Sequence, residues 1–340
     1  MPSDRLQSRS IRYNARMLSE FDLIARFFTR PRPTGPDARI ALGIGDDCAL
    51  VNPVAGMQLA ISTDMLVEGR HFFAGADPRK LGHKCLAVNL SDLAAMGAKP
   101  LAFTLSLALP SAEPDWLAAF SSGLFALADA HDCELIGGDT TKGPLTVCIT
   151  IFGELPVGTG LRRDGAQVGD DLWVSGTLGD ARLALAGYRG ELALDHAEQE
   201  HAGERMHLPT PRIDLGLRLR GIASAAIDIS DGLCGDLQHI LDRSGVGATV
   251  HADALPAGPV LLQHPQALRR SFCLSGGDDY ELCFTAAANR RDEVVAAAQG
   301  AGVAVTRIGT IDAAPGLRLL DETGKRLDLT PSSFDHFRSP

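Results

Sequence analysis

Short apolar segments that end in a carboxylate recur along this chain, and they constrain its fold more than any other feature. The first, over 57–62, reads as a buried strand and leads to Asp64. A helix is predicted over 78–98 with Asp77 as its N-cap. The apolar stripe of this helix includes Asp92, a carboxylate where an apolar side chain is expected. A carboxylate there is costly unless a positive charge meets it, which favours a bound metal ion.

The same signature of a strand, a glycine turn or hydroxyl groups, and a carboxylate occurs in five separate segments. Magnesium prefers hard oxygen ligands and is commonly held by a few carboxylates together with substrate phosphates. The sequence therefore predicts a magnesium-dependent phosphoryl-transfer site, where positioning and charge neutralisation carry most of the catalysis. The five segments are Asp46/Asp47, Ser62-Thr63-Asp64, Asp92, Asp139 and Asp228-Ile229-Ser230-Asp231.

Strands and helices alternate in both halves of the sequence, which predicts an α/β fold built from α+β layers. With 340 residues, the chain is long enough for two domains that each bury a core. We expect a flexible leader over 1–13, an N-terminal domain over 14–155 and a C-terminal domain over 156–340. The boundary is placed where glycine and proline loosen the pattern. A polar insertion with weak helical character is expected over 189–206.

Charge and composition exclude several classes of protein. The formal net charge is −10 at pH 7, which argues against binding to nucleic acid. No apolar run is long enough to span a bilayer, and the N-terminal residues lack the apolar block of a signal peptide. The seven cysteines include no CxxC pair, so neither disulfides nor a zinc site is expected, and the cytoplasm is favoured. The acids comprise 30 Asp and 12 Glu, a bias typical of turns, caps and metal-facing strand ends.

Absent motifs narrow the chemistry further. The chain has no GxxxxGK[ST] P-loop, no protein-kinase catalytic loop, no HExxH and no GxSxG. A nucleotide would therefore be bound mainly through metal ions, with Arg163 and the Gly137-Gly138 backbone as direct contacts. His71 could contact a substrate, although a single histidine among aromatic residues is more often structural. Asp231 is equally well placed as the N-cap of the helix that follows it.

Together these residues resemble the thiamine-monophosphate kinases of the AIR-synthetase-like superfamily. The matching segments occur in order across roughly 20–340 and are specific. They are GIGDDCAL (43–50), STDMLVEGRHF (62–72), KCLAVNLSDLAAMGAKP (84–100), GGDTTKGPL (137–145), LRRDGAQVGDD (161–171), IDISDGL (227–233) and SGGDDYELCFT (275–285).

The resemblance implies ATP-dependent phosphorylation of thiamine monophosphate to thiamine diphosphate with several magnesium ions. It implies a two-domain AIR-synthetase-like fold whose N-terminal sheet pairs across a homodimer, with a C-terminal domain that closes over the nucleotide. The implied magnesium ligands are Asp47, Ser62, Thr63, Asp64, Asp92, Asp139, Asp228 and Asp231. The implied ATP contacts are Gly138, Asp139, Arg163 and Ser230, and the implied substrate contacts are His71, Asp278 and Phe334.

Two of the implied substrate contacts depart from the family pattern. The family usually has Glu where this chain has Asp278, so the carboxylate here is one methylene shorter. It usually has Tyr or Trp at the position of Phe334, which keeps the stacking face but lacks the polar group.

The acceptor in such a reaction would be an oxygen of a phosphate monoester. Its second pKa is about 6, so the group is already ionised at neutral pH and needs no general base. The remaining obstacle is the approach of two anions, which magnesium and Arg163 would overcome. We therefore expect direct in-line transfer with no catalytic base and no phosphoenzyme.

Other functions are compatible with the same residues. The nearest are other ATP-dependent enzymes of the superfamily: a purine cyclo-ligase, selenophosphate synthetase or a hydrogenase-maturation dehydratase. The dehydratase needs a C-terminal Cys, whereas this chain ends in Pro340. Selenophosphate synthetase needs a reactive Cys or selenocysteine near its N-terminus, and the first Cys here, Cys48, is expected to be buried. A magnesium or nucleotide sensor without catalysis is the alternative of another class.

Overall fold

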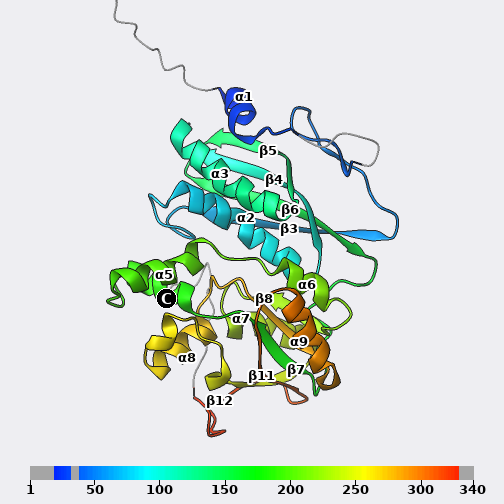
Figure 1. The fold of residues 1–340 in the computed structure, drawn as a ribbon, viewed down its shortest axis with the longest axis vertical. Coiled ribbons are helices and arrows are strands. Elements are labelled where there is room, and N and C mark those ends of the chain that lie inside the picture. Colours follow the sequence, from blue (N-terminus) through cyan, green and yellow to red (C-terminus); the bar gives the residue numbers. More distant parts are fainter. Residues whose placement is uncertain (1–18, 32–37, 329–340) are drawn as a thin grey trace, which may run out of the picture.

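The computed structural model of the protein describes residues 19–31 and 38–328. Two α/β domains are stacked along the longest axis of the molecule, with the N-terminal domain at the top of Figure 1. The leader expected over 1–13 and the predicted substrate contact Phe334 lie outside the described residues.

The N-terminal domain is built on a four-stranded sheet with the order β3-β6-β4-β5. Strands β4 and β5 are parallel, and the other neighbours are antiparallel. A short α1 with a π-helical turn and the β1–β2 pair precede this sheet. The elements are α1 (Glu20–Leu23), the turn Ile24–Phe28, β1 (Ile40–Leu42), β2 (Leu50–Val51), β3 (Met57–Val67), β4 (Lys99–Leu109), β5 (Glu134–Lys142) and β6 (Thr146–Pro156).

Helices α2 (Pro78–Ala95) and α3 (Pro114–Ala130) lie on the same face of this sheet. Helix α2 begins as predicted, because Asp77 accepts hydrogen bonds from two first-turn N–H groups at 2.8 and 3.3 Å. The two helices approach closely at Gly82 and Gly123. A Cβ on either glycine would lie 2.1 or 1.9 Å from a backbone oxygen of the other helix, so only glycine fits.

Strand β3 is not buried, contrary to the expectation for 57–62. The side chains of Leu59, Ile61 and Met65 are 53%, 60% and 55% exposed. The reason is its place at the edge of the sheet, where one face packs toward α2 and the other is open. Because alternate residues of a strand face opposite sides, Asp64 shares the covered face and Thr63 shares the open one.

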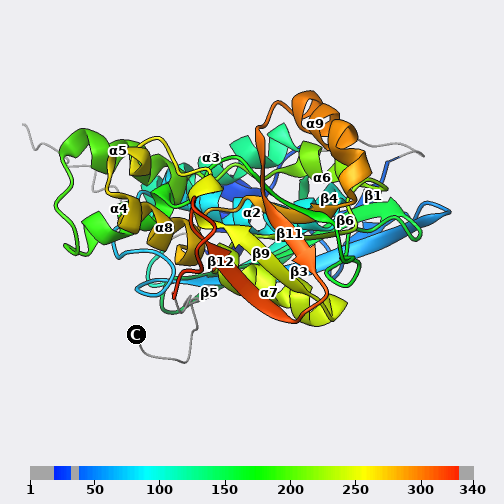
Figure 2. The ribbon, with the colours of Figure 1, turned by 90° about the horizontal axis from the view of Figure 1, so that it is seen from below.

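The C-terminal domain contains a six-stranded sheet with the order β12-β9-β11-β7-β10-β8. Alternate residues of β10 enter two different cores: Phe284 packs with α6 and α9, and Cys283 packs with α4, α7 and α8. The helices therefore cover both faces of this sheet, as Figure 2 shows for α9 and α7. The elements are β7 (Asp171–Ser175), α4 (Asp180–Tyr188), α5 (His196–His207), α6 (Ile213–Leu219), β8 (Ala225–Asp228), α7 (Leu233–Ser244), β9 (Gly247–His251), α8 (Gln266–Ser275), β10 (Leu282–Ala286), α9 (Arg291–Gly300), β11 (Val305–Asp312) and β12 (Gly316–Leu320).

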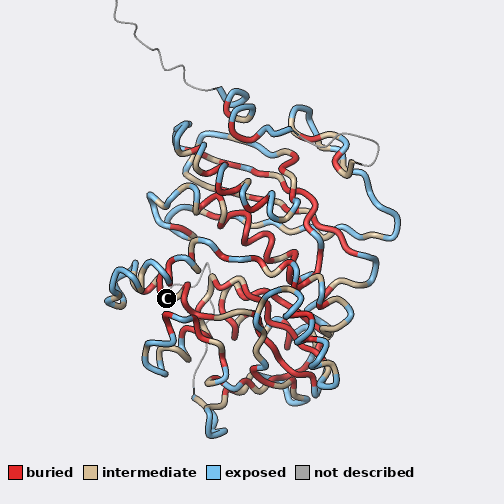
Figure 3. The backbone as a smooth tube through the Cα atoms, in the orientation of Figure 1, coloured by how far each residue is buried: buried red, intermediate tan, exposed pale blue. Residues whose placement is uncertain are grey.

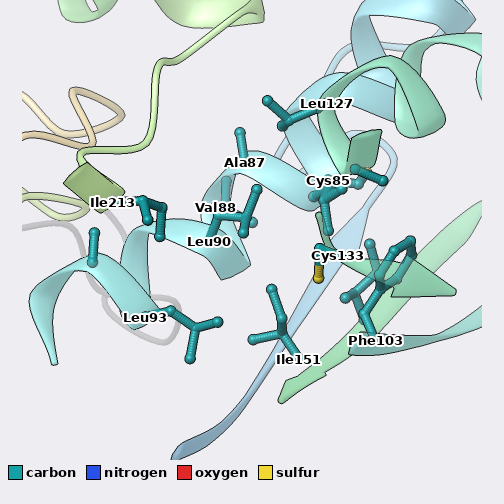
Figure 4. Close-up of a cluster of buried hydrophobic side chains, with 14 of the residues drawn as sticks. Cys85, Ala87, Val88, Leu90, Leu93, Phe103, Leu127, Cys133, Ile151 and Ile213 are labelled. Atoms are coloured by element: carbon teal, nitrogen blue, oxygen red, sulfur yellow. The ribbon is translucent and has the colours of Figure 1, made fainter. Parts of the chain in front are cut away.

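Helix α2 lies at the junction of the two domains. It contacts α3, β3 and β6 on one side and α6 and β8 on the other. Figure 4 shows Leu93 of α2 beside Ile151 of β6, with Ile213 of α6 near Val88. One apolar core therefore continues from the N-terminal domain into the C-terminal one, and buried segments lie on both sides of the junction in Figure 3. The domains are fixed to each other by the same helix that carries Asp92.

The segment expected to be a weakly helical insertion contains the regular helix α5. Its start is fixed by a capping box, in which Asp195 and Glu198 satisfy each other's backbone N–H groups at 2.8 and 2.9 Å. In the part of the chain that the structure describes, no helix combines the length and apolar character needed to cross a membrane.

Candidate functional site

Four of the predicted carboxylates meet at the junction of the domains, and we call Asp64, Asp92, Asp228 and Asp231 the carboxylate cluster. Strand β3 supplies Asp64, helix α2 supplies Asp92, and Asp228 ends strand β8. The charges of Asp92 and Asp231 act on Asp64, and those of Asp92 and Asp64 act on Asp228. The fold thus brings together acids from distant parts of the sequence.

Two serine hydroxyl groups link helix α2 to strand β3 of the N-terminal domain and to strand β8 of the C-terminal domain. The Ser62 hydroxyl on β3 donates to Asp92 Oδ2 at 2.5 Å, and the Ser91 hydroxyl on α2 donates to Asp228 Oδ2 at 2.8 Å. These hydrogen bonds lower the pKa of the carboxyl that accepts them, yet burial outweighs them at both positions. Each bond fixes the direction of one carboxylate.

Burial and mutual repulsion raise the pKa values of the cluster. Burial, followed by the charges of Asp92 and Asp231, raises the pKa of Asp64 to about 7. Burial, followed by the charge of Asp92, raises the pKa of Asp228 to about 8. Burial also raises the pKa of Asp92, and the charge of Arg163 opposes that rise. Ionisation of the whole cluster is therefore unfavourable unless positive charge neutralises it.

Asp231 does not cap helix α7, contrary to one of its two possible roles. The N-cap position is Gly232, which has no side chain to offer. Asp236, one turn into the helix, accepts the backbone N–H groups of residues 230–232, each at 3.1 Å. Burial and the charge of Asp231 raise the pKa of Asp236 to about 7. Asp236 thus accepts the N–H groups at the start of the helix, a role that the position of Asp236 in the first turn could have suggested.

The cluster suits magnesium better than a metal enclosed by protein ligands alone. Among residues 19–31 and 38–328, no three His, Cys, Asp or Glu side chains are arranged to hold one metal ion. Magnesium commonly uses one or two carboxylates and completes its shell with water and substrate phosphates. Hard carboxylate oxygens with raised pKa values fit that pattern, because a divalent cation would favour their ionised form.

Three predicted metal ligands are exposed, unlike the carboxylate cluster. Asp47 is exposed in the turn after β1, and the Thr63 hydroxyl bonds to that of Thr150 at 2.9 Å on the open face of the sheet. Asp139 is exposed on β5, at the opposite edge of the sheet from β3. With β6 and β4 between them, these edges are three strand spacings apart, about 14 Å. The cluster and these residues form separate sets.

The predicted ATP contacts occupy different positions around the cluster. Arg163 is exposed and acts electrostatically on Asp92. Ser230 lies between two cluster carboxylates in sequence, and its carbonyl accepts the Asp278 N–H at 2.8 Å. Gly138 has a φ of 143°, and a Cβ there would lie 1.8 Å from the backbone oxygen of Leu105, which only glycine avoids.

A pocket of about 380 Å³ lies at the N-terminal end of α2, with aromatic and basic side chains in its wall. His71 lines it, and its Nδ1 accepts the Val67 N–H at 3.0 Å. The Phe73 and Tyr188 rings come from different domains, with centroids 5.7 Å apart. The lining residues are His71, Phe72, Phe73, Ala74, Gly75, Ala76, Asp77, Lys80, Leu81, Lys84, Tyr188, Met206 and His207.

Polar side chains join this pocket to the carboxylate cluster. Lys84 lines the pocket and donates to Asp278 Oδ2 at 2.5 Å. The hydroxyl of Tyr280 hydrogen-bonds to Asp278, and the pKa of Tyr280 is raised well above its usual value by burial and then by the charges of Asp278, Asp64 and Asp228. The predicted substrate contact Asp278 therefore lies between the pocket and the cluster.

Sequence reasoning missed Lys84 and misplaced Cys48. Lys84 lies two turns before Asp92 on the apolar stripe, so the argument that identified Asp92 could also have identified Lys84. Cys48 is exposed rather than buried, because it follows the exposed Asp46–Asp47 turn.

The sequence matches two protein-family models and several thiamine-monophosphate kinases. A family model for AIR synthase related protein, N-terminal domain, matches residues 45–155. A second, for the C-terminal domain of AIR synthase related protein, matches residues 167–322. The thiamine-monophosphate kinase of Salmonella typhimurium is 48% identical over 326 residues, covering 94% of this chain and 99% of that protein. That of Escherichia coli K12 is 46% identical with the same coverage.

Solved structures give the same result in three dimensions. Thiamine-monophosphate kinase from Stenotrophomonas maltophilia K279a has a TM-score of 0.79 and 50% identity, covering 84% of this chain and 92% of that one. AaThiL complexed with AMPPCP and TMP has a TM-score of 0.73 and 30% identity, covering 84% and 89%. The hydrogenase maturation protein HypE shares the fold, with a TM-score of 0.73 at 19% identity over 94% and 98%.

Proposed function

Because the chain belongs to the thiamine-monophosphate kinase family of AIR-synthase-related proteins, we propose that it uses ATP to phosphorylate thiamine monophosphate to thiamine diphosphate. The family resemblance and two-domain α/β fold expected from the sequence are confirmed. One observation carries the proposal: a chain 48% identical to such a kinase over nearly its whole length has a pocket joined to a carboxylate cluster. The complex of AaThiL with AMPPCP and TMP supports both substrates.

Magnesium would be held by the carboxylate cluster, with Ser62 beside Asp92. Bound magnesium supplies neutralisation of phosphate charge, which lets two anionic substrates approach. Asp47, Thr63 and Asp139 complete the proposed ligand set through the family resemblance. Their exposed positions make them accessible to ions that arrive with the phosphates of ATP. The two sets then describe several magnesium sites rather than one.

ATP would lie against Gly138, Asp139, Arg163 and Ser230. The backbone at Gly138 presents no side chain, so a phosphate can approach it closely. The charge of Arg163 acts on Asp92, which supports a role for Arg163 beside the phosphates of ATP.

Thiamine monophosphate would occupy the pocket at the start of α2, with His71 and Asp278 as contacts. The family resemblance adds Phe334, which lies outside the described residues. Its aromatic rings suit the exposed Phe73 and Tyr188, because flat heterocycles stack on aromatic side chains. Its positively charged thiazolium would also be favoured by aromatic faces. The phosphate would then point along α2 toward the carboxylate cluster.

The proposed transfer is direct. A phosphate oxygen of thiamine monophosphate attacks the γ-phosphorus of ATP, the bond to the bridging oxygen breaks, and ADP leaves. No protein group takes a proton in this scheme, so residues of the chain position the substrates and balance their charge. Isolation of a phosphorylated protein residue during turnover would contradict this mechanism.

The function is tested by release of ADP in a coupled assay with three acceptors. Thiamine monophosphate should support turnover, whereas thiamine and formylglycinamidine ribonucleotide should not. Turnover with the ribonucleotide would instead favour a purine cyclo-ligase, and binding of ATP and magnesium without any turnover would favour a sensor. Asp139→Asn should fold normally and lose nearly all activity. If this variant stays active at limiting magnesium, Asp139 is not a magnesium ligand.

A homodimer and a cytoplasmic location complete the proposal. The open face of β3 exposes Leu59, Ile61 and Met65, an apolar surface that a second copy of the sheet would cover. All seven cysteines are free thiols, as expected in a reducing compartment. Sedimentation at micromolar concentration tests the dimer, and Ile61→Asp should shift it toward the monomer.

A further inference from the structure

Lys84 is a buried ammonium group at the inner end of the pocket. Only 4% of its side chain is exposed, and its Nζ donates to Asp278 Oδ2 at 2.5 Å and to the Met206 carbonyl at 2.9 Å. A buried ammonium is costly unless it is paired and hydrogen-bonded. Both partners belong to the C-terminal domain, whereas Lys84 belongs to α2, so the pair crosses the domain junction.

The partner carboxylate is held in an unusual backbone conformation. Asp278 has a φ of 71° and Tyr280 a φ of 50°, a left-handed region that non-glycine residues seldom adopt. The Asp278 N–H donates to the Ser230 carbonyl at 2.8 Å, which fixes the segment beside the carboxylate cluster. Strained segments of this kind persist only when their surroundings hold them in place.

The exposed fractions of the two side chains give them different roles. The Asp278 side chain is 31% exposed, whereas Lys84 is almost completely covered. A bound molecule can therefore reach the Asp278 carboxylate. Lys84 is shielded from solvent and acts on that carboxylate through their ion pair. An aspartate is one methylene shorter than glutamate, so its carboxylate depends more on the backbone and on this support for its position.

We propose that Lys84 is a positioning residue for the thiamine substrate. It fixes the Asp278 carboxylate between the pocket and the carboxylate cluster, where the carboxylate would contact the substrate. The inference rests on the proposed function and deepens it by naming what orients the substrate contact. Because the same helix carries Lys84 and Asp92, α2 sets the spacing between substrate and carboxylate cluster. Eight residues of helix correspond to about 12 Å.

The test compares Lys84→Met, Asp278→Asn and the double variant by steady-state kinetics with each substrate varied in turn. Lys84→Met should raise the KM for thiamine monophosphate at least tenfold and leave the KM for ATP within twofold. The double variant should match Asp278→Asn within twofold, because Lys84 acts through Asp278. Lys84→Arg keeps the charge and should recover part of the affinity. Lys325→Met, an exposed charge in the turn after β12, is the matched control and should behave as wild type.

Binding of thiamine monophosphate by calorimetry separates this inference from the proposed function. A wild-type protein that neither binds nor phosphorylates thiamine monophosphate overturns both. If the wild type binds and Lys84→Met binds equally well, only the role of Lys84 is refuted. The role of Lys84 is also refuted if the two single substitutions raise the KM for thiamine monophosphate independently, so that their effects multiply in the double variant. An equal rise of the KM for thiamine monophosphate and the KM for ATP in Lys84→Met refutes it as well. If Lys84→Met fails to fold, Lys84→Arg and Asp278→Asn are compared with wild type instead. An unchanged KM for thiamine monophosphate in both variants would overturn the inference.

Discussion

Buried carboxylates occur in two contrasting environments in this protein. In the C-terminal domain, Asp171 is only 2% exposed, and Arg291 and Arg307 donate to it at 2.5 and 3.1 Å. Hydrogen bonding from Arg291 holds the pKa of Asp171 below its usual value. In the carboxylate cluster, by contrast, Asp64 and Asp228 face other acids, and their pKa values rise to about 7 and 8.

Glu281 extends the first environment. Its side chain is fully buried and accepts hydrogen bonds from Arg205 at 2.8 Å and from Arg212 at 2.6 Å. Arg205 lies on α5, so this carboxylate ties the helix that supplies Met206 to the sheet. The arginine-paired acids are neutralised by positive charges within the fold, whereas the acids of the carboxylate cluster mainly face one another. The arginine-paired acids therefore stabilise the fold, whereas the proposed role of the carboxylate cluster is to bind cations.

The largest expected effect is loss of activity in the cluster. Asp92→Asn should lower kcat/KM by about 10²–10³-fold, because it removes a charge that is proposed to position cations at the transferring phosphate. The fold should persist, since asparagine can still accept the Ser62 hydroxyl and repulsion within the cluster falls. The assay is ADP release with circular dichroism as the check on folding. Asp242→Asn changes an exposed acid on α7 and is the control. Full activity of Asp92→Asn would show that Asp92 is not part of the active site.

The opposite result is expected for the arginine-paired acids. Glu281→Gln should lower the free energy of unfolding by about 3 kcal/mol, because it leaves two largely buried arginines without their counter-charge. Asp228→Asn should leave that free energy unchanged or raise it. Urea denaturation of the two variants beside wild type measures the difference. Equal destabilisation by both would mean that the two environments are not physically distinct.

Local signals in the sequence point to members of the carboxylate cluster. In the sequence, Asp64 follows an apolar run and Asp92 interrupts an apolar helical stripe, and both patterns can be recognised within a few residues. In the structure, Asp64 lies inside β3, which continues to Val67. The same reasoning treats 57–62 as a buried strand, because a short apolar run does not reveal whether its strand lies at a sheet edge. Edge position depends on pairing with β6, nearly ninety residues later in the sequence.

Partnerships between distant residues are what the sequence does not reveal. Lys84 and Asp278 are separated by 194 positions, and no local pattern indicates their ion pair. The sequence also marks Thr63 and Asp64 as equivalent neighbours, although the strand turns them to opposite faces of the sheet. The separation of Asp139 from Asp64 follows from strand order, which the alternation of strands and helices leaves open.

In the absence of ATP, magnesium should stabilise the protein through the carboxylate cluster. At a concentration 100 times the dissociation constant, a ligand that binds only the folded state adds about 2.7 kcal/mol. Thermal unfolding with and without magnesium should show this gain in wild type and in Glu281→Gln but not in Asp92→Asn. Treatment with a chelator, followed by its removal, clears adventitious cations before the measurement. A magnesium gain that survives in Asp92→Asn would place the ion elsewhere.

The smallest expected effect is the pH dependence of stability without magnesium. Asp64 and Asp228 have folded pKa values of about 7 and about 8 against an ordinary value of 3.8, so the folded protein holds protons that the unfolded chain has released. Their contribution is full below about pH 4 and is lost as pH rises through 7 and 8. Because the two groups interact, we expect a net fall of about 1 to 2 kcal/mol in the free energy of unfolding between pH 6 and pH 8.

Magnesium should oppose this fall, since cations favour the ionised carboxylates, and the gain on adding magnesium should therefore grow with pH. Urea denaturation at pH 6 and pH 8, with and without magnesium, measures both slopes. Asp228→Asn removes one of the carboxyls whose pKa is raised and should make the slope seen without magnesium shallower. Asp171, whose pKa is lowered, loses its contribution only in acid and should not affect this window. A wild-type stability that rises from pH 6 to pH 8 without magnesium would show that the cluster is already paired with positive charge in the folded protein, and the contrast with Asp171 would then disappear.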